Sequence, residues 1–177
     1  LFIGSLFLLI LLLVRQQVKI KLLESFSMRD SATGIDNIYG LRERLSKAIA
    51  VSRRYGNQYV GLLRFIVSLP KESCNAKKQE NIDTLAQKIT ERVGQIIRSS
   101  DSLARIGSLD FVILVPLLNC CEELEGLQNK IQTVFNNPFS IEDNSCILKV
   151  SFTSKLSKNP KISADSFLDL SLTDTEN

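Results

Sequence analysis

Two short groups of residues in the middle of the chain have the types and spacing that ligand chemistry needs. In the first, Arg98 and Asp101 are separated by two serines, so a guanidinium and a carboxylate stand close together in the chain. A guanidinium can donate two parallel hydrogen bonds to guanine O6 and N7 or bind a phosphate, and a nearby carboxylate can accept from guanine N1 and N2. The pair is therefore a candidate for recognising a guanine edge.

The same two residues also have a purely structural interpretation. An arginine at the C-terminal end of a helix interacts favourably with the helix dipole. An aspartate three residues later is a common turn former that accepts hydrogen bonds from its own backbone. Arg92 and Arg105 are further arginines that could assist a ligand, although most exposed arginines are merely solvated. The sequence leaves both interpretations open.

The second group is a turn between two apolar segments. It consists of Gly107, Ser108, Leu109, Asp110 and Phe111. A glycine lets the backbone reach unusual dihedral angles and approach a phosphate closely, and a carboxylate oxygen is a ligand that Mg²⁺ prefers. The question is whether this segment is an active-site turn, the remains of one, or an ordinary hairpin.

The composition of the 177-residue chain removes several classes of function. Histidine is absent, which excludes Ser-His-Asp triads, Cys-His pairs and most zinc sites. The net charge of +3 is too small to argue for nucleic acid, and the basic residues form no stripe with interleaved aromatics. No P-loop is present. The cysteines lack CxxC spacing and are expected to be reduced thiols: Cys74, Cys120, Cys121 and Cys146.

Residues 1–14, LFIGSLFLLILLLV, are apolar and uncharged. As a helix they would cover about 21 Å, short of the roughly 30 Å hydrocarbon core, which fits the C-terminal part of a transmembrane helix or the core of a signal peptide. Basic residues follow the segment rather than precede it, at Arg15, Lys19 and Lys21. This arrangement favours a membrane span that ends in the cytoplasm.

Residues 15–29 are expected to form a juxtamembrane linker helix. Val18, Leu22 and Phe26 make a thin apolar seam along it, which is typical of a docking face for a partner helix. We therefore expect a membrane protein partner that binds through this N-terminal helix.

The remainder alternates helical and strand-like patterns and predicts an α/β domain over residues 30–170, with a polar tail at 171–177. The expected order is α-β-α-β-β-α-β, which implies a central mixed sheet with helices on its faces. Helices are expected at 38–52, 82–97 and 122–135, and strands at 59–69, 103–106, 111–115 and 147–153.

This order and its motifs resemble the GGDEF domain, the diguanylate cyclase fold. The opening DSATGIDN at 30–37 is similar to the family's D-x-L-T-G-L-x-N. Residues 98–116 follow the pattern R-x-x-D…A-R-x-G-G-D-E-F-x-x-x-x-P. Asp83 falls where the family has the Asp of its G-D pair, and VSFT at 150–153 looks like the later V-S-I-G strand.

The resemblance implies that the catalytic apparatus has been lost. In the family, an Asp on the first strand and the acidic third residue of the signature turn hold Mg²⁺. The joining of two GTP molecules requires this ion to neutralise triphosphate charge and help activate the attacking 3′-hydroxyl. Here Arg64 stands at the strand position, Ile66 replaces the next strand acid, and Leu109 is the third turn residue. Ser108 replaces the second glycine, and only Asp110 keeps a carboxylate. We expect no cyclase activity, no bound metal and no other cofactor.

Arg98 and Asp101, by contrast, match the family's inhibitory site, an R-x-x-D that binds cyclic di-GMP. The resemblance implies a catalytically inactive receptor or signalling subunit in the bacterial inner membrane, with its soluble domain in the cytoplasm. The alternative is a structural subunit of a membrane complex that binds no nucleotide. A GTP-binding domain without cyclase activity is disfavoured by Arg64 and Ser108. Active members work as pairs, so a homodimer remains open.

Overall fold

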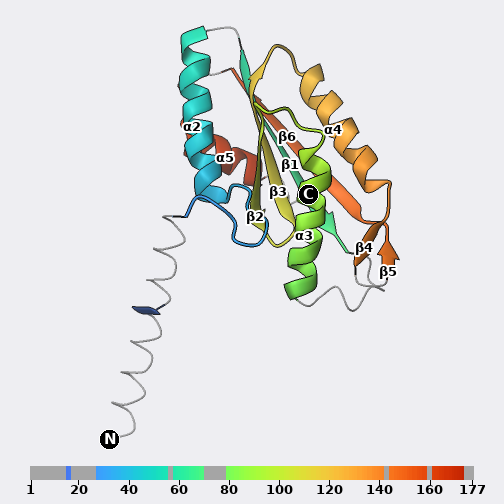
Figure 1. Cartoon of the computed structure of the whole chain (residues 1–177). Helices are drawn as coiled ribbons and strands as arrows, with labels where there is room; N and C mark the ends of the chain where they lie inside the picture. The colour runs from blue at the N-terminus through green and yellow to red at the C-terminus, as the bar shows by residue number, and fades with distance from the viewer. Residues whose placement is uncertain are drawn as a thin grey trace, which may run out of the picture.

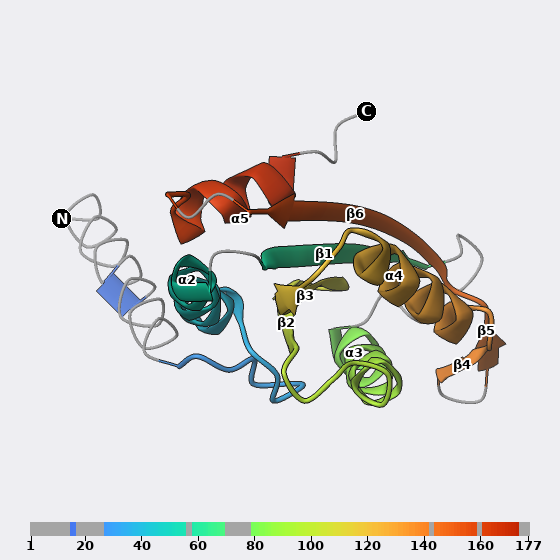
Figure 2. The ribbon, with the colours of Figure 1, turned by 90° about the horizontal axis from the view of Figure 1, so that it is seen from above.

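The computed structural model describes residues 15–16, 27–55, 58–69, 79–141, 144–158 and 161–173. A four-stranded sheet lies at the centre of the domain, and helices cover both of its faces (Figures 1 and 2). The elements are α2 (Ile38–Tyr55), β1 (Tyr59–Ser68), α3 (Gln79–Gly94), β2 (Ser102–Gly107), β3 (Asp110–Leu118), α4 (Glu122–Phe135), β4 (Phe139–Ile141), β5 (Asn144–Cys146), β6 (Lys149–Ser157) and α5 (Ala164–Thr173).

The strand order is β2-β3-β1-β6, and every neighbouring pair is antiparallel. The expectation of a mixed sheet was therefore wrong. The connection through α3 returns the chain so that β2 runs in the same direction as β1, but β3 lies between them. In the same way β1 lies between β3 and β6. Each crossover skips one strand, as in a split βαβ unit, so parallel strands are never neighbours.

Two hydrophobic cores lie on opposite faces of the sheet because successive strand residues point to opposite sides. Leu63, Phe65 and Val67 of β1 face α3 and α4, and Phe65 stacks on Phe111 of β3 with ring centroids 5.2 Å apart. Leu62 of β1 faces α2 and α5. The same alternation places the side chain of Arg64 in β1 on the face that α2 covers.

The sequence patterns missed the short β4–β5 hairpin that follows α4. Its strands have three residues each, too few to show a period, although Phe139 is completely buried. The guanidinium of Arg92 lies 4.0 Å from the centre of the Phe139 ring and donates to the carbonyls of Asn137 and Pro138. The last strand, expected at 147–153, runs from 149 to 157.

A turn at residues 30–36 attaches the start of the domain to the edge of the sheet. Asp30 accepts a hydrogen bond from the amide of Gly34, which has a φ of 72°. Asp36 forms a parallel bridge with Ala104 of β2 and an antiparallel bridge with Arg29. The Asp36 carboxylate is buried and ion-paired with Arg44. The turn therefore lies directly beside β2.

The ends of the chain lie mostly outside the described residues. This applies to residues 1–14, the expected membrane span, to 17–26, most of the expected linker helix, and to 174–177. Residues 15–16 are helical, whereas 27–29 belong to no helix. Within the part of the chain that the structure describes, no helix is long and apolar enough to cross a membrane. Helix α5 extends to Thr173, into the segment expected as a polar tail.

Candidate functional site

The signature turn joins β2 to β3 as a tight hairpin, with Gly107 paired to Asp110. The side chain of Leu109 turns into the core on the α3 and α4 side and is only 8% exposed. Its carbonyl accepts a hydrogen bond of 2.9 Å from the amide of Val67, which attaches the turn to β1. The third residue of the turn is therefore part of the hydrophobic core.

Arg64 of β1 and Asp110 of β3 form a bidentate ion pair. The Arg64 Nε atom donates to Asp110 Oδ1 at 3.0 Å, and Nη2 donates to Oδ2 at 2.8 Å. In the register of the two strands, Arg64 lies opposite Val112 and Asp110 opposite Ile66, so the pair is diagonal on the α2 face. The side chains are 11% and 19% exposed. The hydrogen bonds to Asp110 raise the pKa of the Arg64 guanidinium above its usual range.

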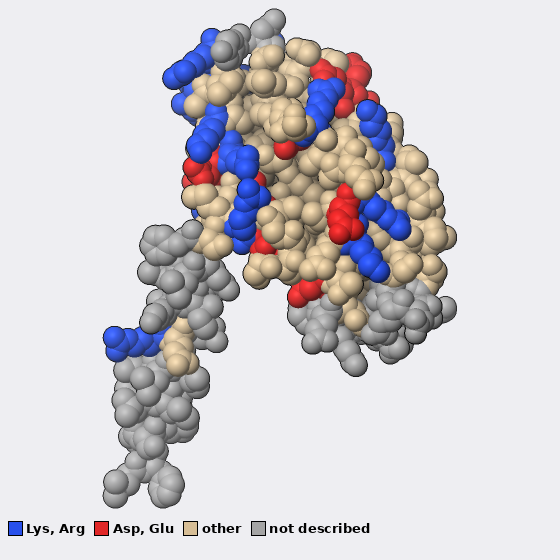
Figure 3. Space-filling model, in the orientation of Figure 1, with Lys and Arg blue, Asp and Glu red and all other residues tan. Residues whose placement is uncertain are grey.

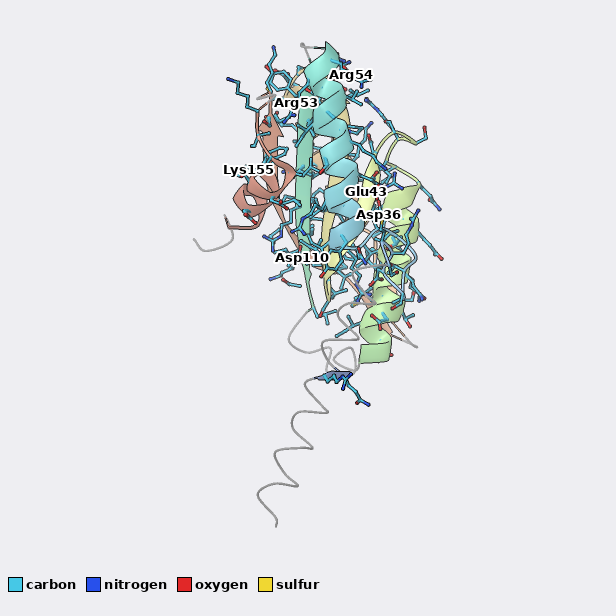
Figure 4. The ribbon with its side chains drawn as sticks, turned by 90° about the vertical axis from the view of Figure 1, so that its left-hand side faces the viewer. Asp36, Glu43, Arg53, Arg54, Asp110 and Lys155 are labelled. Carbon is cyan, nitrogen blue, oxygen red and sulfur yellow. The ribbon has the colours of Figure 1, made fainter. Side chains whose placement is uncertain are left out.

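The ion pair lies at one end of the sheet. Figure 4 shows Asp110 near the end where α2 begins, whereas Arg53 and Arg54 lie at the opposite end of that helix. On the face shown in Figure 3, basic side chains gather along the left-hand side of the domain, while acidic and basic side chains lie next to one another elsewhere. Three basic residues of α2 are paired with carboxylates: Arg42 with Asp165, Arg44 with Asp36, and Lys47 with Glu43.

Arg105 of β2 connects three separate parts of the chain. Its Nη1 atom donates to Asp30 Oδ1 at 3.2 Å and its Nη2 atom to Asp83 Oδ1 at 2.7 Å. Nε and Nη2 also donate to the carbonyl of Ser108, and Nε donates to that of Gly107. Arg105 is only 7% exposed. The opening turn, α3 and the signature hairpin are thus held together by one buried guanidinium.

A cavity of about 720 Å³ opens beside this network. Its walls come from the opening turn, the start of α2, Asp83 and the hairpin, so it brings together segments that are far apart in the sequence. Polar lining residues include Asp30, Asn37, Asp83, Arg105 and Ser108.

Asp30 is held in its charged form at this site. Burial raises its pKa, but hydrogen bonds from the hydroxyl and amide of Thr33, together with Arg105, outweigh that effect. The net result is a pKa below the usual value of 3.8.

Arg98 and Asp101 lie on the turn that precedes β2, at the end of the strand opposite to Arg105. The Arg98 amide donates to Asp101 Oδ2 at 3.0 Å, and the Asp101 amide donates to the Arg98 carbonyl at 3.0 Å. Ser100 Oγ donates to Asp101 Oδ1. The Asp101 carboxylate thus caps its own turn, as the structural interpretation expected.

The guanidinium of Arg98 points outward and its side chain is 64% exposed. Its Nη1 atom donates to Oε2 of Glu123 on α4 at 3.2 Å. Within the described residues, no partner is recorded for its Nε or Nη2 atoms. Arg98 therefore remains available to a ligand on one edge.

Neither of the other two arginines assists this pair directly. Arg105 is buried in the network with Asp30 and Asp83, and Arg92 binds the carbonyls that precede β4. Sequence reasoning missed Glu123 because it is 25 residues from Arg98. It also took Arg105 for an exposed residue; the signal that could have corrected this is the pair of carboxylates at Asp30 and Asp83.

Two of the described cysteines have a thiol pKa above its usual value. A hydrogen bond with Glu122 raises the pKa of the exposed Cys120 thiol, and burial raises the pKa of Cys146. Both effects favour the thiol over the reactive thiolate. Cys74 lies outside the described residues. In the described ranges, no group of three or more cysteines and carboxylates could hold a metal ion.

A scan of family models matches residues 27–171 to the family described as diguanylate cyclase, GGDEF domain. This match covers more than three quarters of the chain and confirms the resemblance seen in the sequence. No match was found among curated protein sequences.

Solved structures support the same fold. The isolated GGDEF domain of TpbB (YfiN) from Pseudomonas aeruginosa has a TM-score of 0.70 and 20% identity, over 81% of this chain and 83% of that chain. DgcB from Caulobacter crescentus, whose coiled coil and GGDEF domain were solved with c-di-GMP, has a TM-score of 0.69 and 14% identity, over 90% and 84%. Diguanylate cyclase SiaD of P. aeruginosa, in complex with its activator SiaC, has a TM-score of 0.66 and 20% identity, over 88% and 63%.

Proposed function

Because the chain belongs to the GGDEF family of diguanylate cyclases, we propose that it is a catalytically inactive member that acts as a cyclic di-GMP receptor. The ligand binds at Arg98 and Asp101. The observation that carries this proposal is the exposed Arg98 guanidinium, held next to Asp101 on one turn with its Nε and Nη2 atoms unpartnered within the described residues.

The chemistry of this turn suits a guanine edge. The Nε and Nη2 atoms of an arginine match the spacing of guanine O6 and N7. The Asp101 carboxylate uses lone pairs on its own turn, but two carboxylate oxygens have about four acceptor positions and can also accept from guanine N1 and N2. DgcB, which shares the fold, was solved with c-di-GMP.

Inactivity is supported by the side chains that occupy the family's metal positions. A divalent cation needs several oxygen ligands, but Arg64 brings a positive charge and Leu109 brings none of the required oxygens. The one nearby carboxylate, Asp110, is already neutralised by Arg64. These residues therefore do not fit Mg²⁺. Incubation of the chain with GTP and Mg²⁺ should yield no cyclic di-GMP by chromatography; product would contradict the proposal.

The membrane role is a further part of the proposal. The apolar segment 1–14 and the basic residues that follow it support an anchor in the bacterial inner membrane with the domain in the cytoplasm. The linker segment would bind a membrane partner. SiaD, a relative in fold, was solved with an activator protein. If the anchor exists, the full chain should sediment with membranes and a variant lacking residues 1–14 should not.

A second candidate function is a structural subunit that binds no nucleotide. The observation that favours it is that both residues have internal contacts: Asp101 caps its turn and Arg98 pairs with Glu123. These contacts would be sufficient to explain the two residues without a ligand.

Calorimetric titration of the full chain with cyclic di-GMP separates the two. The receptor predicts binding at micromolar concentration or tighter that Arg98→Ala abolishes. Arg54→Ala serves as the matched control, because Arg54 is also an exposed arginine but lies on α2, which packs on the other face of the sheet from α4 and Glu123. If saturating cyclic di-GMP gives no heat of binding and no thermal shift, the result supports the structural subunit and contradicts the receptor.

A further inference from the structure

Glu123 lies in the first turn of α4 and is fixed there by two groups of Asn119. Its Oε1 atom accepts a hydrogen bond of 3.0 Å from the Asn119 amide and one of 3.2 Å from the Asn119 Nδ2 atom. Its other oxygen, Oε2, faces Arg98. One carboxylate oxygen therefore anchors the side chain to the loop that precedes α4, and the other is directed at the turn before β2.

The anchor keeps Glu123 negatively charged. The hydrogen bond from the Asn119 amide lowers the pKa of Glu123, and Arg98 and the Asn119 side chain act in the same direction. Glu123 is 23% exposed, in contrast to the 64% of Arg98. The carboxylate is thus the better fixed member of the pair, and the arginine is the member that it orients.

The contact uses only one corner of the Arg98 guanidinium. Nη1 donates to Glu123, whereas Nε and Nη2, which form the opposite edge, have no recorded partner within the described residues. An arginine binds a planar acceptor pair through two such neighbouring nitrogens. We propose that Glu123 is a positioning residue of the Arg98 site, which holds the Nε–Nη2 edge ready for a guanine; this inference rests on the proposed function.

The same contact selects between ligands. A fixed carboxylate 3.2 Å from Arg98 Nη1 repels an approaching phosphate but does not repel a neutral base edge. Guanine offers two acceptors, O6 and N7, whereas adenine offers a donor at N6 in place of O6. The Nε–Nη2 edge of Arg98 therefore favours guanine over adenine. Glu123 strengthens this preference by fixing the orientation of that edge, and its charge disfavours free phosphate.

Titration of the full chain tests the proposal with three probes: cyclic di-GMP, cyclic di-AMP and inorganic pyrophosphate. The variant is Glu123→Gln, which keeps an oxygen for the Asn119 amide and removes the charge. Glu125→Gln is the matched control, since it makes the same change in the same helix turn on an exposed residue with no recorded partner among the described residues.

We expect Glu123→Gln to bind cyclic di-GMP about two- to fivefold more weakly than wild type, the range typical of losing an exposed ion pair. Its preference over cyclic di-AMP should shrink, and pyrophosphate should bind more tightly. Glu125→Gln should match wild type in all three titrations. A general loss of structure would not raise affinity for pyrophosphate, so this readout separates positioning from folding.

Two results would overturn the inference in distinguishable ways. If wild type binds cyclic di-GMP and Glu123→Gln binds all three probes as wild type does, Glu123 has no positioning role and the receptor proposal stands. If wild type does not bind cyclic di-GMP, the receptor proposal fails and the inference fails with it. A ligand-free check is the NMR signal of the Arg98 Nε–H group, which should shift in Glu123→Gln and stay in place in Glu125→Gln.

Discussion

Arg64 is a charged residue in the middle of an apolar strand, and such a residue is stable only with a partner. Asp110 provides two hydrogen bonds from the neighbouring strand. The pair lies beside the hairpin that joins β2 to β3, and Arg64 neutralises the Asp110 carboxylate there. We therefore expect both members of the pair to affect stability together.

Replacing Arg64 by Met should lower the free energy of unfolding by about 2–3 kcal/mol, because it leaves the Asp110 carboxylate 19% exposed and without its counter-ion. The double change Arg64→Met with Asp110→Leu should be more stable than Arg64→Met alone, since no buried charge is left. Urea denaturation of the four members of this cycle measures the coupling. Simple additivity of the two single changes would contradict a direct interaction.

Asp30 makes a prediction about acid stability. Its pKa is lowered in the folded state, so it contributes stability that is fully present above about pH 4 and is lost as the pH falls through the lower folded value. Asp30→Asn should be less stable than wild type at neutral pH, and the difference should shrink below about pH 4. Thr33→Val removes a hydrogen bond of 2.6 Å to this carboxylate and should move the acid transition upward. Thermal unfolding from pH 2 to 7 measures both; parallel curves would count against the network.

At the scale of elements, α2 is packed very closely on the segment that precedes it. A Cβ atom at Gly40 would collide with the backbone carbonyl of Met28 and lie 3.1 Å from the Cβ of Asp36. A backbone atom cannot move aside as the end of a side chain can. The glycine is therefore needed for the approach of the helix to the opening turn.

Gly40→Ala should destabilise the domain by about 1–3 kcal/mol, as overpacking does. Gly126→Ala in α4 is the opposite case, because nothing lies within 4 Å of its added Cβ. That change should stabilise by about 0.5–1 kcal/mol through helix propensity. Thermal melts of the two variants give the comparison, and an unchanged or raised midpoint in Gly40→Ala would show that crowding at Gly40 is unimportant.

The elements that could be predicted from the sequence are those with a strong period or a clear turn. The α3 pattern and the apolar run of β1 were located within a few residues, and Gly107 marked the hairpin. The direction of neighbouring strands was not predictable, because an apolar run reports burial on both faces and says nothing of which strand lies beside it. The β4–β5 hairpin was too short to leave a pattern.

The site was less predictable than the fold because its contacts join distant residues. The turn-capping role of Asp101 was foreseen as part of the structural interpretation, and the structure shows it together with an exposed Arg98. The Arg64–Asp110 pair was not foreseen, because Arg64 was seen only as a departure from the family pattern and Asp110 only as the carboxylate that the turn keeps. An arginine in a buried strand is expected to pair with a carboxylate. The sequence did not indicate which carboxylate, because Asp110 lies 46 residues from Arg64.

At the scale of the whole molecule, the two cores share one sheet and should unfold together. Leu41→Ala on the α2 face and Leu85→Ala on the α3 face remove side chains that are almost fully buried, and each should cost about 2–5 kcal/mol. Because β1 and β3 contribute to both cores, far-UV circular dichroism and tyrosine fluorescence should give the same midpoint in each variant. Separate midpoints would show that the two layers unfold independently.

The ion pair between Arg105 and Asp30 determines how far the domain can be truncated at its N-terminus. All strands and α2 to α5 lie after residue 37, so a fragment beginning there would keep both hydrophobic layers. It would nevertheless lose the Asp30 carboxylate, 75 residues away from Arg105, and the bridge of Asp36 to β2. A buried guanidinium would then be left with Asp83 as its only recorded carboxylate partner. The N-terminal border of the autonomous folding unit is therefore set by a charge that needs neutralising, and it lies ahead of Asp30 rather than at the start of α2.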